Sequence, residues 1–115
     1  MGDRGQVKVA GIYLYTHWGA EDLVKNVKQA LSLGWRWDDK EYLARIIFDV
    51  MSKGCHGEET GFGIGSTQHE DIWRLIEIED NKIIVKDLYE SKQIQFEGTF
   101  KDFLAWNEKK EAQKK

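Results

Sequence analysis

The hydrophobic positions along the chain change their period twice. From Val7 to Trp18, apolar side chains occupy both phases of a two-residue alternation, which predicts one strand covered on both faces. Apolar residues then recur every three or four positions, and this spacing predicts helices over Ala20–Leu33 and Asp39–Ser52. From Phe62 onward the period of two returns. The pattern therefore predicts a strand, two long helices and then a group of strands.

The residues that flank the two helical stripes agree with this interpretation. Glu21 and Asp22 lie in the first turn of the first helix, where the helix dipole favours negative charge. Gly34 follows that helix and can adopt the left-handed conformation of a C-terminal cap. Asp38, with Glu41 three residues later, resembles a capping box for the second helix.

The second half of the chain consists of short segments separated by turn residues. Asp80–Asn81 predicts a two-residue hairpin turn, because both residue types tolerate left-handed backbone angles. Thr99 begins a short C-terminal helix. The strands predicted on either side of these signals are Phe62–Thr67, Ile72–Glu79, Lys82–Leu88 and Gln93–Gly98.

We therefore predict one α+β domain over residues 1–115, with two long helices and a C-terminal helix packed on a sheet of four to five strands. Short connections in the second half predict that the sheet is mostly antiparallel. Residues 1–6 and 108–115 are polar or charged, and we expect both ends to be flexible.

Composition and charge narrow the classes of partner. The net charge of −3 disfavours nucleic acid, whose phosphate backbone requires a basic surface. The sequence has neither a run of about 20 apolar residues nor the apolar core of a signal peptide, so we expect no membrane partner. A single cysteine excludes an internal disulfide and favours a cytoplasmic location.

The candidate chemistry lies in two stretches. Gly54–Ser66 contains five glycines, which permit close approach of a ligand to the main chain, but it lacks the Gly-Lys-Ser/Thr ending of a phosphate loop. Thr16, His17 and Trp18 end the first strand, and strand ends commonly carry site residues. We expect the two stretches to meet and form a pocket. The ligand-binding residues predicted for it are Thr16, Trp18, Thr60, Gly61, Phe62 and Gly63.

Three classes of function are compatible with these residues. The leading hypothesis is a module that binds a small polar or anionic ligand, with nucleotides as one example. The second is a hydrolase or transferase in which His17 is the general base and Glu59 its partner. The third is a protein-interaction or inhibitor module that acts through exposed aromatics such as Trp73 and Trp106. A homodimer through a sheet edge or an aromatic face is a further expectation.

Metal binding is disfavoured by the spacing of the potential ligands. Cys55, His56, His69 and His17 all carry zinc-ligating atoms, but the side chains of the adjacent pair Cys55–His56 diverge, and no Cys-x-x-Cys accompanies them. We therefore predict no metal and no cofactor, and we assign no role to Cys55, His56 or His69.

Three segments taken together resemble a known group of proteins. They are Leu14-Tyr-Thr-His-Trp-Gly19, Arg36-Trp-Asp-Asp39 with Tyr42-Leu-Ala-Arg-Ile-Ile-Phe48, and Glu59-Thr-Gly-Phe-Gly-Ile64. Similar Tyr-Thr-His-Trp-Gly-Gly and Glu-Thr-Gly-Tyr-Gly-Ile motifs occur in small uncharacterised proteins of prokaryotes and their mobile elements or viruses. Ala20 and Phe62 depart from those motifs. The resemblance spans about residues 12–65 and implies no reaction, cofactor or site residue.

Overall fold

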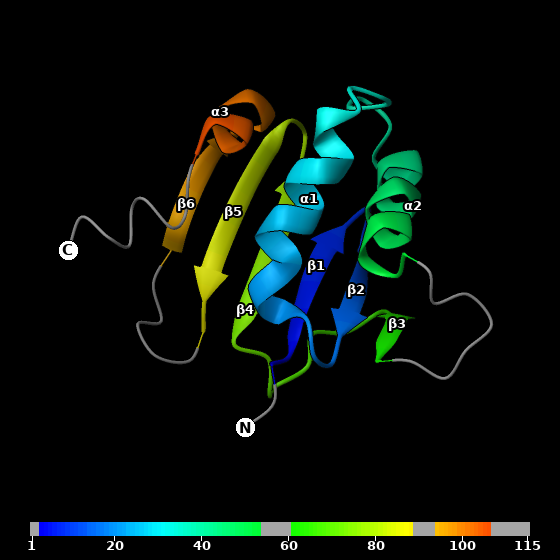
Figure 1. Cartoon of the computed structure of the whole chain (residues 1–115), viewed down its shortest axis with the longest axis vertical. Coiled ribbons are helices and arrows are strands. Elements are labelled where there is room, and N and C mark those ends of the chain that lie inside the picture. Colours follow the sequence, from blue (N-terminus) through cyan, green and yellow to red (C-terminus); the bar gives the residue numbers. More distant parts are fainter. Residues whose placement is uncertain (1–2, 54–60, 89–93, 107–115) are drawn as a thin grey trace.

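The computed structural model of the chain describes residues 3–53, 61–88 and 94–106 and has two layers, one of strands and one of helices (Figure 1). Six strands form one sheet in the order β3-β2-β1-β4-β5-β6. The strands are β1 (Gly5–Val9), β2 (Ile12–Thr16), β3 (Phe62–Gly65), β4 (Arg74–Glu79), β5 (Lys82–Asp87) and β6 (Ile94–Thr99). A short 3-10 turn, η1 (Ala20–Asp22), precedes the helices α1 (Leu23–Ser32), α2 (Lys40–Met51) and α3 (Phe100–Ala105).

The apolar run predicted as one strand is a hairpin, and this corrects the predicted strand count. Ala10 and Gly11 connect β1 to β2 with positive φ angles of 56° and 78°. Two consecutive left-handed residues make the tight turn whose twist suits a hairpin. Alanine rarely adopts this conformation, so Ala10 is not a residue type that predicts a reversal of the chain. The sheet therefore has six strands instead of four to five.

The sheet is mixed because β1 pairs in parallel with β4, Gly5 opposite Arg74 and Val9 opposite Ile78. The other neighbouring pairs, β1–β2, β2–β3, β4–β5 and β5–β6, are antiparallel, as we expected for most of the sheet. The chain also enters the sheet earlier than its polar beginning suggested, since β1 starts at Gly5 within the segment expected to be flexible.

The two helical stripes bury their predicted faces against the sheet. Leu23, Val27 and Leu31 of α1 are completely buried, and burial of each such side chain contributes about 1.5–3 kcal/mol. Gly34 ends this helix with a φ of 73°, as expected of a C-terminal cap. The N-terminal cap of α2 is Asp39 instead of the predicted Asp38, because the Asp39 carboxylate accepts a hydrogen bond from the Tyr42 amide.

The second half follows its turn signals closely. Asp80 and Asn81 form the predicted two-residue turn, with positive φ angles of 34° and 64°, and set Glu79 opposite Lys82. Thr99 caps α3 in a reciprocal capping box with Asp102.

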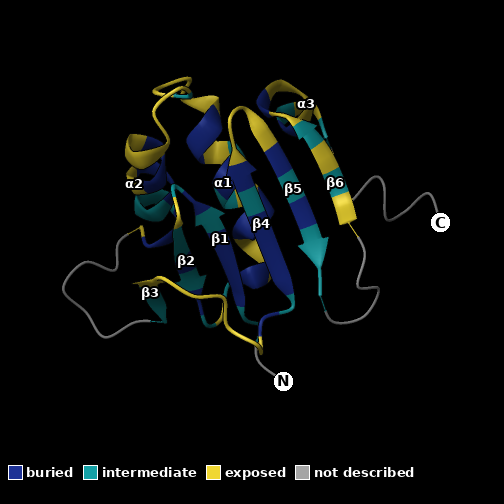
Figure 2. Cartoon of the chain, turned by 180° about the vertical axis from the view of Figure 1, so that it is seen from behind, coloured by how far each residue is buried: buried dark blue, intermediate teal, exposed yellow. Residues whose placement is uncertain are grey.

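Both long helices lie on one face of the sheet, and no helix covers the other face within the described residues (Figures 1 and 2). The helix-free face carries two ion pairs across β4, β5 and β6, in which Lys86 pairs with Glu77 at 2.9 Å and Lys82 with Glu97 at 2.7 Å. The segment between β3 and β4 must pass β2 and β1, and it does so across this face (Figure 2).

The described residues form a single compact domain with a radius of gyration of 13.4 Å. Among them, no helix has the length and apolar character needed to cross a membrane.

We predict that Gly5→Ala lowers the free energy of unfolding by about 1–3 kcal/mol, the usual cost of overpacking a core. A β-carbon at Gly5 would lie 2.8 Å from Leu23 Cδ1 and 2.9 Å from Ala20 Cβ. The matched control is Gly63→Ala, whose β-carbon would meet nothing within 4 Å. Urea denaturation should show a clear loss for the first variant only, and equal stability of the two variants would contradict this packing.

Candidate functional site

The end of β2 is held by a local turn. Thr16 is 2% exposed, and its Oγ1 accepts a hydrogen bond of 3.0 Å from the Gly19 amide. This bond fixes the course of the chain through His17 and Trp18, which follow at the rim of the sheet. Thr16 was predicted to bind ligand, but its side chain is buried and supports the turn.

The two stretches predicted to meet are in contact. Strand β3 pairs with β2, Phe62 opposite Thr16 and Gly63 opposite Tyr15. Beyond the strand, the His17 amide donates a hydrogen bond of 2.8 Å to the Gly61 carbonyl.

Gly61 is required at this point, because a β-carbon there would lie 2.6 Å from the Trp18 ring. The other two residues predicted from the glycine-rich stretch, Glu59 and Thr60, lie outside the described residues, as do Cys55 and His56.

The side chain of His17 belongs to a hydrogen-bonded network. Its Nδ1 lies 3.2 Å from Nε of Arg4 and 3.0 Å from the hydroxyl of Tyr15. A guanidinium can only donate, so Nδ1 of His17 is the acceptor and carries no proton. The neutral imidazole therefore holds its proton on Nε2, which has no hydrogen-bond partner among the residues that the structure describes. In this state His17 offers an N–H donor, while the lone pair that a general base needs is already engaged.

The segment that crosses the helix-free face supplies the rest of the network. Asp71 forms an ion pair of 2.8 Å with Nη1 of Arg4, and the ring of His69 stacks on Tyr15 with centroids 4.5 Å apart. Burial and the charge of Asp71 raise the pKa of Tyr15 above its ordinary value, while Arg4 opposes the shift. Tyr15 therefore stays protonated at neutral pH and can donate to His17.

Gln6 anchors the crossing segment to β1. Its side-chain nitrogen donates to the Thr67 carbonyl at 3.2 Å, and its side-chain oxygen accepts from the His69 amide at 2.9 Å. Gln6 is 1% exposed although it points to the face that has no helix. This buried amide satisfies two backbone groups of the segment and so positions both His69 and Asp71.

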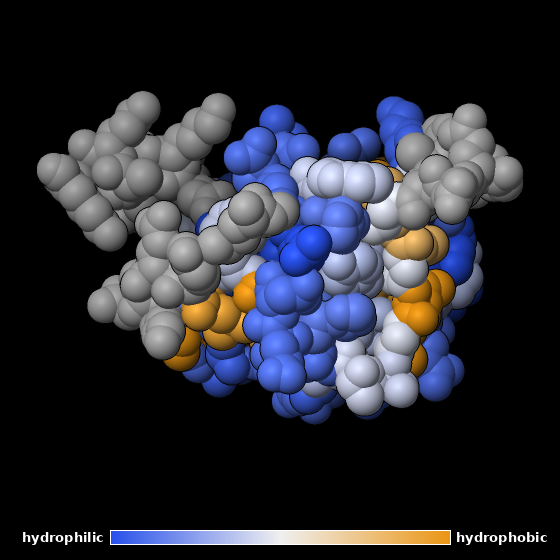
Figure 3. All heavy atoms as spheres, turned by 90° about the horizontal axis from the view of Figure 1, so that it is seen from below, coloured by the Kyte–Doolittle hydropathy of each residue, from blue (hydrophilic) through white to orange (hydrophobic). Residues whose placement is uncertain are grey.

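Trp18 is the exposed element of the site. Its side chain is 69% exposed and meets the His17 ring edge-on, with centroids 4.6 Å apart. Viewed from below, this end of the molecule has a hydrophilic middle with apolar patches to either side (Figure 3). An indole that remains exposed beside a polar network forms a flat platform on which a planar group can stack.

The network includes four residues that no pattern in the sequence marks as site residues. Arg4 and Gln6 lie in the segment 1–6 that was expected to be flexible, and Tyr15 lies within the strand predicted from Val7 to Trp18. Asp71 lies in a polar turn. Each has at least one partner far away in the sequence, as in the pairs Arg4–Asp71, Gln6–Thr67 and Tyr15–His69. No local spacing signals such contacts.

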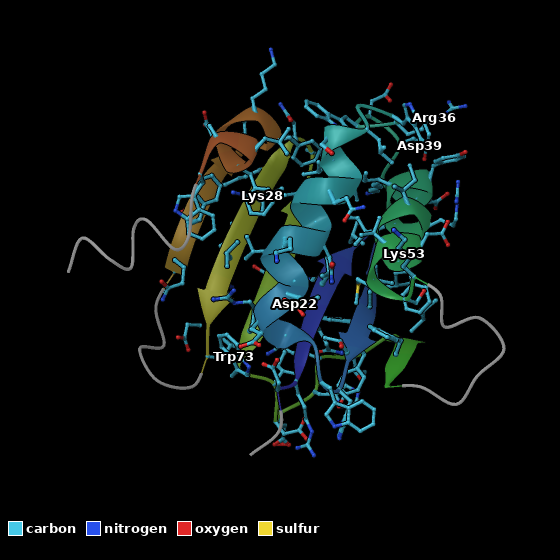
Figure 4. The ribbon with its side chains drawn as sticks, viewed as in Figure 1. Asp22, Lys28, Arg36, Asp39, Lys53 and Trp73 are labelled. Atoms are coloured by element: carbon cyan, nitrogen blue, oxygen red, sulfur yellow. The ribbon has the colours of Figure 1, made fainter. Side chains whose placement is uncertain are left out.

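The aromatics proposed for a protein interface are placed differently from the expectation. Trp73 is half-buried and donates through Nε1 to Asp3 at 2.7 Å (Trp73 is labelled in Figure 4). Trp106 is half-buried and stacks on Phe96 with centroids 5.0 Å apart. Both residues are engaged in internal packing, so neither is an exposed anchor.

No group of three or more His, Cys, Asp or Glu side chains suited to a metal ion occurs in the described part of the chain. Comparisons with protein-family models, with curated proteins and with solved structures each found no significant match. The resemblance of the three motifs to small prokaryotic and viral proteins therefore remains an expectation.

The raised pKa of Tyr15 predicts a loss of stability in alkali. The unfolded chain releases this proton near the ordinary pKa of about 10, and the folded protein retains it to higher pH. The unfolded state then binds fewer protons, so the free energy of unfolding falls as pH rises through this window.

Urea denaturation between about pH 9 and pH 11 should show a shallower decline for Tyr15→Phe than for the wild type. The control is Tyr13→Phe, two residues away on the same strand face, because its hydroxyl is not part of the network around His17. A decline in Tyr15→Phe as steep as that of the wild type would contradict the assignment.

Proposed function

We propose that the protein binds a small, planar, polar ligand at the surface formed by His17 and Trp18. The observation that carries this proposal is the engagement of Nδ1 of His17 by Arg4 and Tyr15. It leaves an N–H donor at Nε2 beside an indole that is 69% exposed. A ring that stacks on Trp18 and presents an oxygen or nitrogen acceptor to Nε2 would use both groups.

The local charge favours a polar ligand over a strongly anionic one. Arg4 is the cation closest to His17 in the network, and its charge is offset by Asp71. Asp3 lies in the same region, where its carboxylate accepts from Trp73 and from the Glu21 amide. A phosphate group on the ligand therefore contributes little to its affinity. The contacts that determine binding are made by a nucleobase or a similar heterocycle. Nucleosides and nucleotides both fit this class.

The alternative of a hydrolase or transferase requires His17 as a general base. That role needs a free lone pair directed at the substrate. The donors on Nδ1 support a role for His17 in binding instead. Turnover that disappears in His17→Ala, with the fold retained, would restore the enzyme hypothesis.

Calorimetric titration with adenosine, AMP and inorganic phosphate tests the proposal. Adenosine and AMP should bind with similar affinity, and phosphate should not bind. Trp18→Ala should weaken binding roughly tenfold or more, the usual effect of removing a stacking platform. Trp35→Ala is the matched control, because Trp35 is 57% exposed in the link between α1 and α2, away from the site.

A second variant isolates the donor of His17. In His17→Asn the amide oxygen can still accept from Arg4 and Tyr15, but the group that corresponds to Nε2 is removed. Binding should weaken while the denaturation midpoint stays near that of the wild type. Phosphate binding as strongly as AMP, or no heat with any of the three compounds, would overturn the proposal.

The proposal includes a cytoplasmic location, which the single cysteine supports. It also includes a homodimer, since β3 and β6 are the edge strands of the sheet and Ile94 at the start of β6 is 52% exposed. Size-exclusion chromatography with light scattering distinguishes a dimer from a monomer, and Ile94→Lys should dissociate a dimer formed through β6.

A further inference from the structure

A cleft of about 710 Å³ opens at the end of the sheet opposite to His17. It lies between the link from α1 to α2, the turn from β4 to β5 and the start of α3. In Figure 4, Asp39 lies at this end of the molecule and Trp73 at the other. Ligand sites commonly have volumes of about 300–1,000 Å³. The cleft is thus large enough for a small organic molecule.

The apolar wall of the cleft is rigidly held. Trp37 donates through Nε1 to the Leu31 carbonyl at 3.0 Å, and its ring meets Phe100 edge-on with centroids 5.4 Å apart. Phe100 is 1% exposed and begins α3 directly after the capping box of Thr99. Leu43 and Ile78 complete this wall and are also buried. A wall fixed in this way does not need to be ordered by a ligand.

The rim of the cleft carries two charges of each sign. Asp38, Lys40, Asp80 and Lys101 are exposed. Within the described residues, none of the four forms an ion pair with another side chain. A second hollow of about 390 Å³ shares Lys40, Ile78 and Asp80 with the cleft and extends it toward the turn from β1 to β2. The rim of the cleft is therefore polar and carries both signs of charge, whereas its wall is apolar.

We propose that this cleft binds a small zwitterion with an apolar body, of which a dipeptide with apolar side chains and two free ends is the simplest example. An ammonium group and a carboxylate together complement the aspartates and the lysines of the rim. A simple anion would be attracted by the two lysines but repelled by the two aspartates. A simple cation would be attracted by the aspartates but repelled by the lysines. The apolar side chains of the dipeptide would lie against the half-buried ring of Trp37, which packs edge-on against Phe100.

Nuclear magnetic resonance of the ¹⁵N-labelled protein tests this site with the dipeptide phenylalanyl-leucine. The indole N–H of Trp37 reports on the cleft, and that of Trp18 reports on the site near His17. We expect the dipeptide to shift the Trp37 signal and to leave the Trp18 signal unchanged. The same dipeptide with an acetylated amino end and an amidated carboxyl end should bind at least about tenfold more weakly, since both charged contacts are lost.

Variants of the rim separate the two charges. Asp80→Asn keeps a residue type that tolerates the positive φ angle of 34° and removes the carboxylate, and Lys101→Gln removes the ammonium group. Each should weaken binding of the dipeptide by about three- to tenfold. Lys25→Gln is the matched control, because Lys25 is exposed on α1 and does not line the cleft.

Three results would overturn the inference. They are equal binding of the free and the capped dipeptide, a shift at Trp18 without one at Trp37, and no shift at Trp37 at millimolar concentrations of the free dipeptide. These results are independent of the test with adenosine, because the two sites have different reporters and different variants.

Discussion

The parallel pairing of β1 with β4 determines the rest of the architecture. It joins an N-terminal hairpin to a C-terminal one in a single sheet, with Gly5 opposite Arg74 and Gln6 opposite Leu75. Because β4 must start beside the beginning of β1, the chain that leaves β3 has to pass two strands. The helices occupy one face, so the passage runs over the other. The crossing segment brings His69 and Asp71 onto Tyr15 and Arg4, and the candidate site is thus a consequence of the topology.

Gln6 makes this crossing energetically acceptable. A segment laid over a sheet must find partners for its backbone groups, because an unsatisfied buried polar group costs about 1–3 kcal/mol. One primary amide donates to one carbonyl and accepts from one N–H, so it satisfies two such groups at once. The same contact determines where His69 and Asp71 stand. The side chain of Gln6 therefore both stabilises the crossing segment and determines the geometry of the site.

The features that could be predicted from the sequence are those encoded locally. The helical stripes of α1 and α2 and the Asp80–Asn81 turn depend on residues a few positions apart, and the structure contains all three. The reversal at Ala10–Gly11 was missed because alanine is an unusual left-handed residue and both flanking strands are apolar. The meeting of His17 with Gly61 was anticipated. The partners Arg4 and Asp71 were not, since their contact depends on a pairing between distant strands.

During synthesis, strand β1 of the first hairpin has to wait for its second partner, β4. β1 and β2 emerge from the ribosome early, but β1 has an open edge until Arg74–Glu79 has also emerged. An unpaired apolar edge such as that of Val7 and Val9 is a template for wrong partners. Contacts between residues so far apart in sequence also form slowly. The nascent chain is therefore most exposed to misassembly in the interval when α1 and α2 are complete and β4 is still missing.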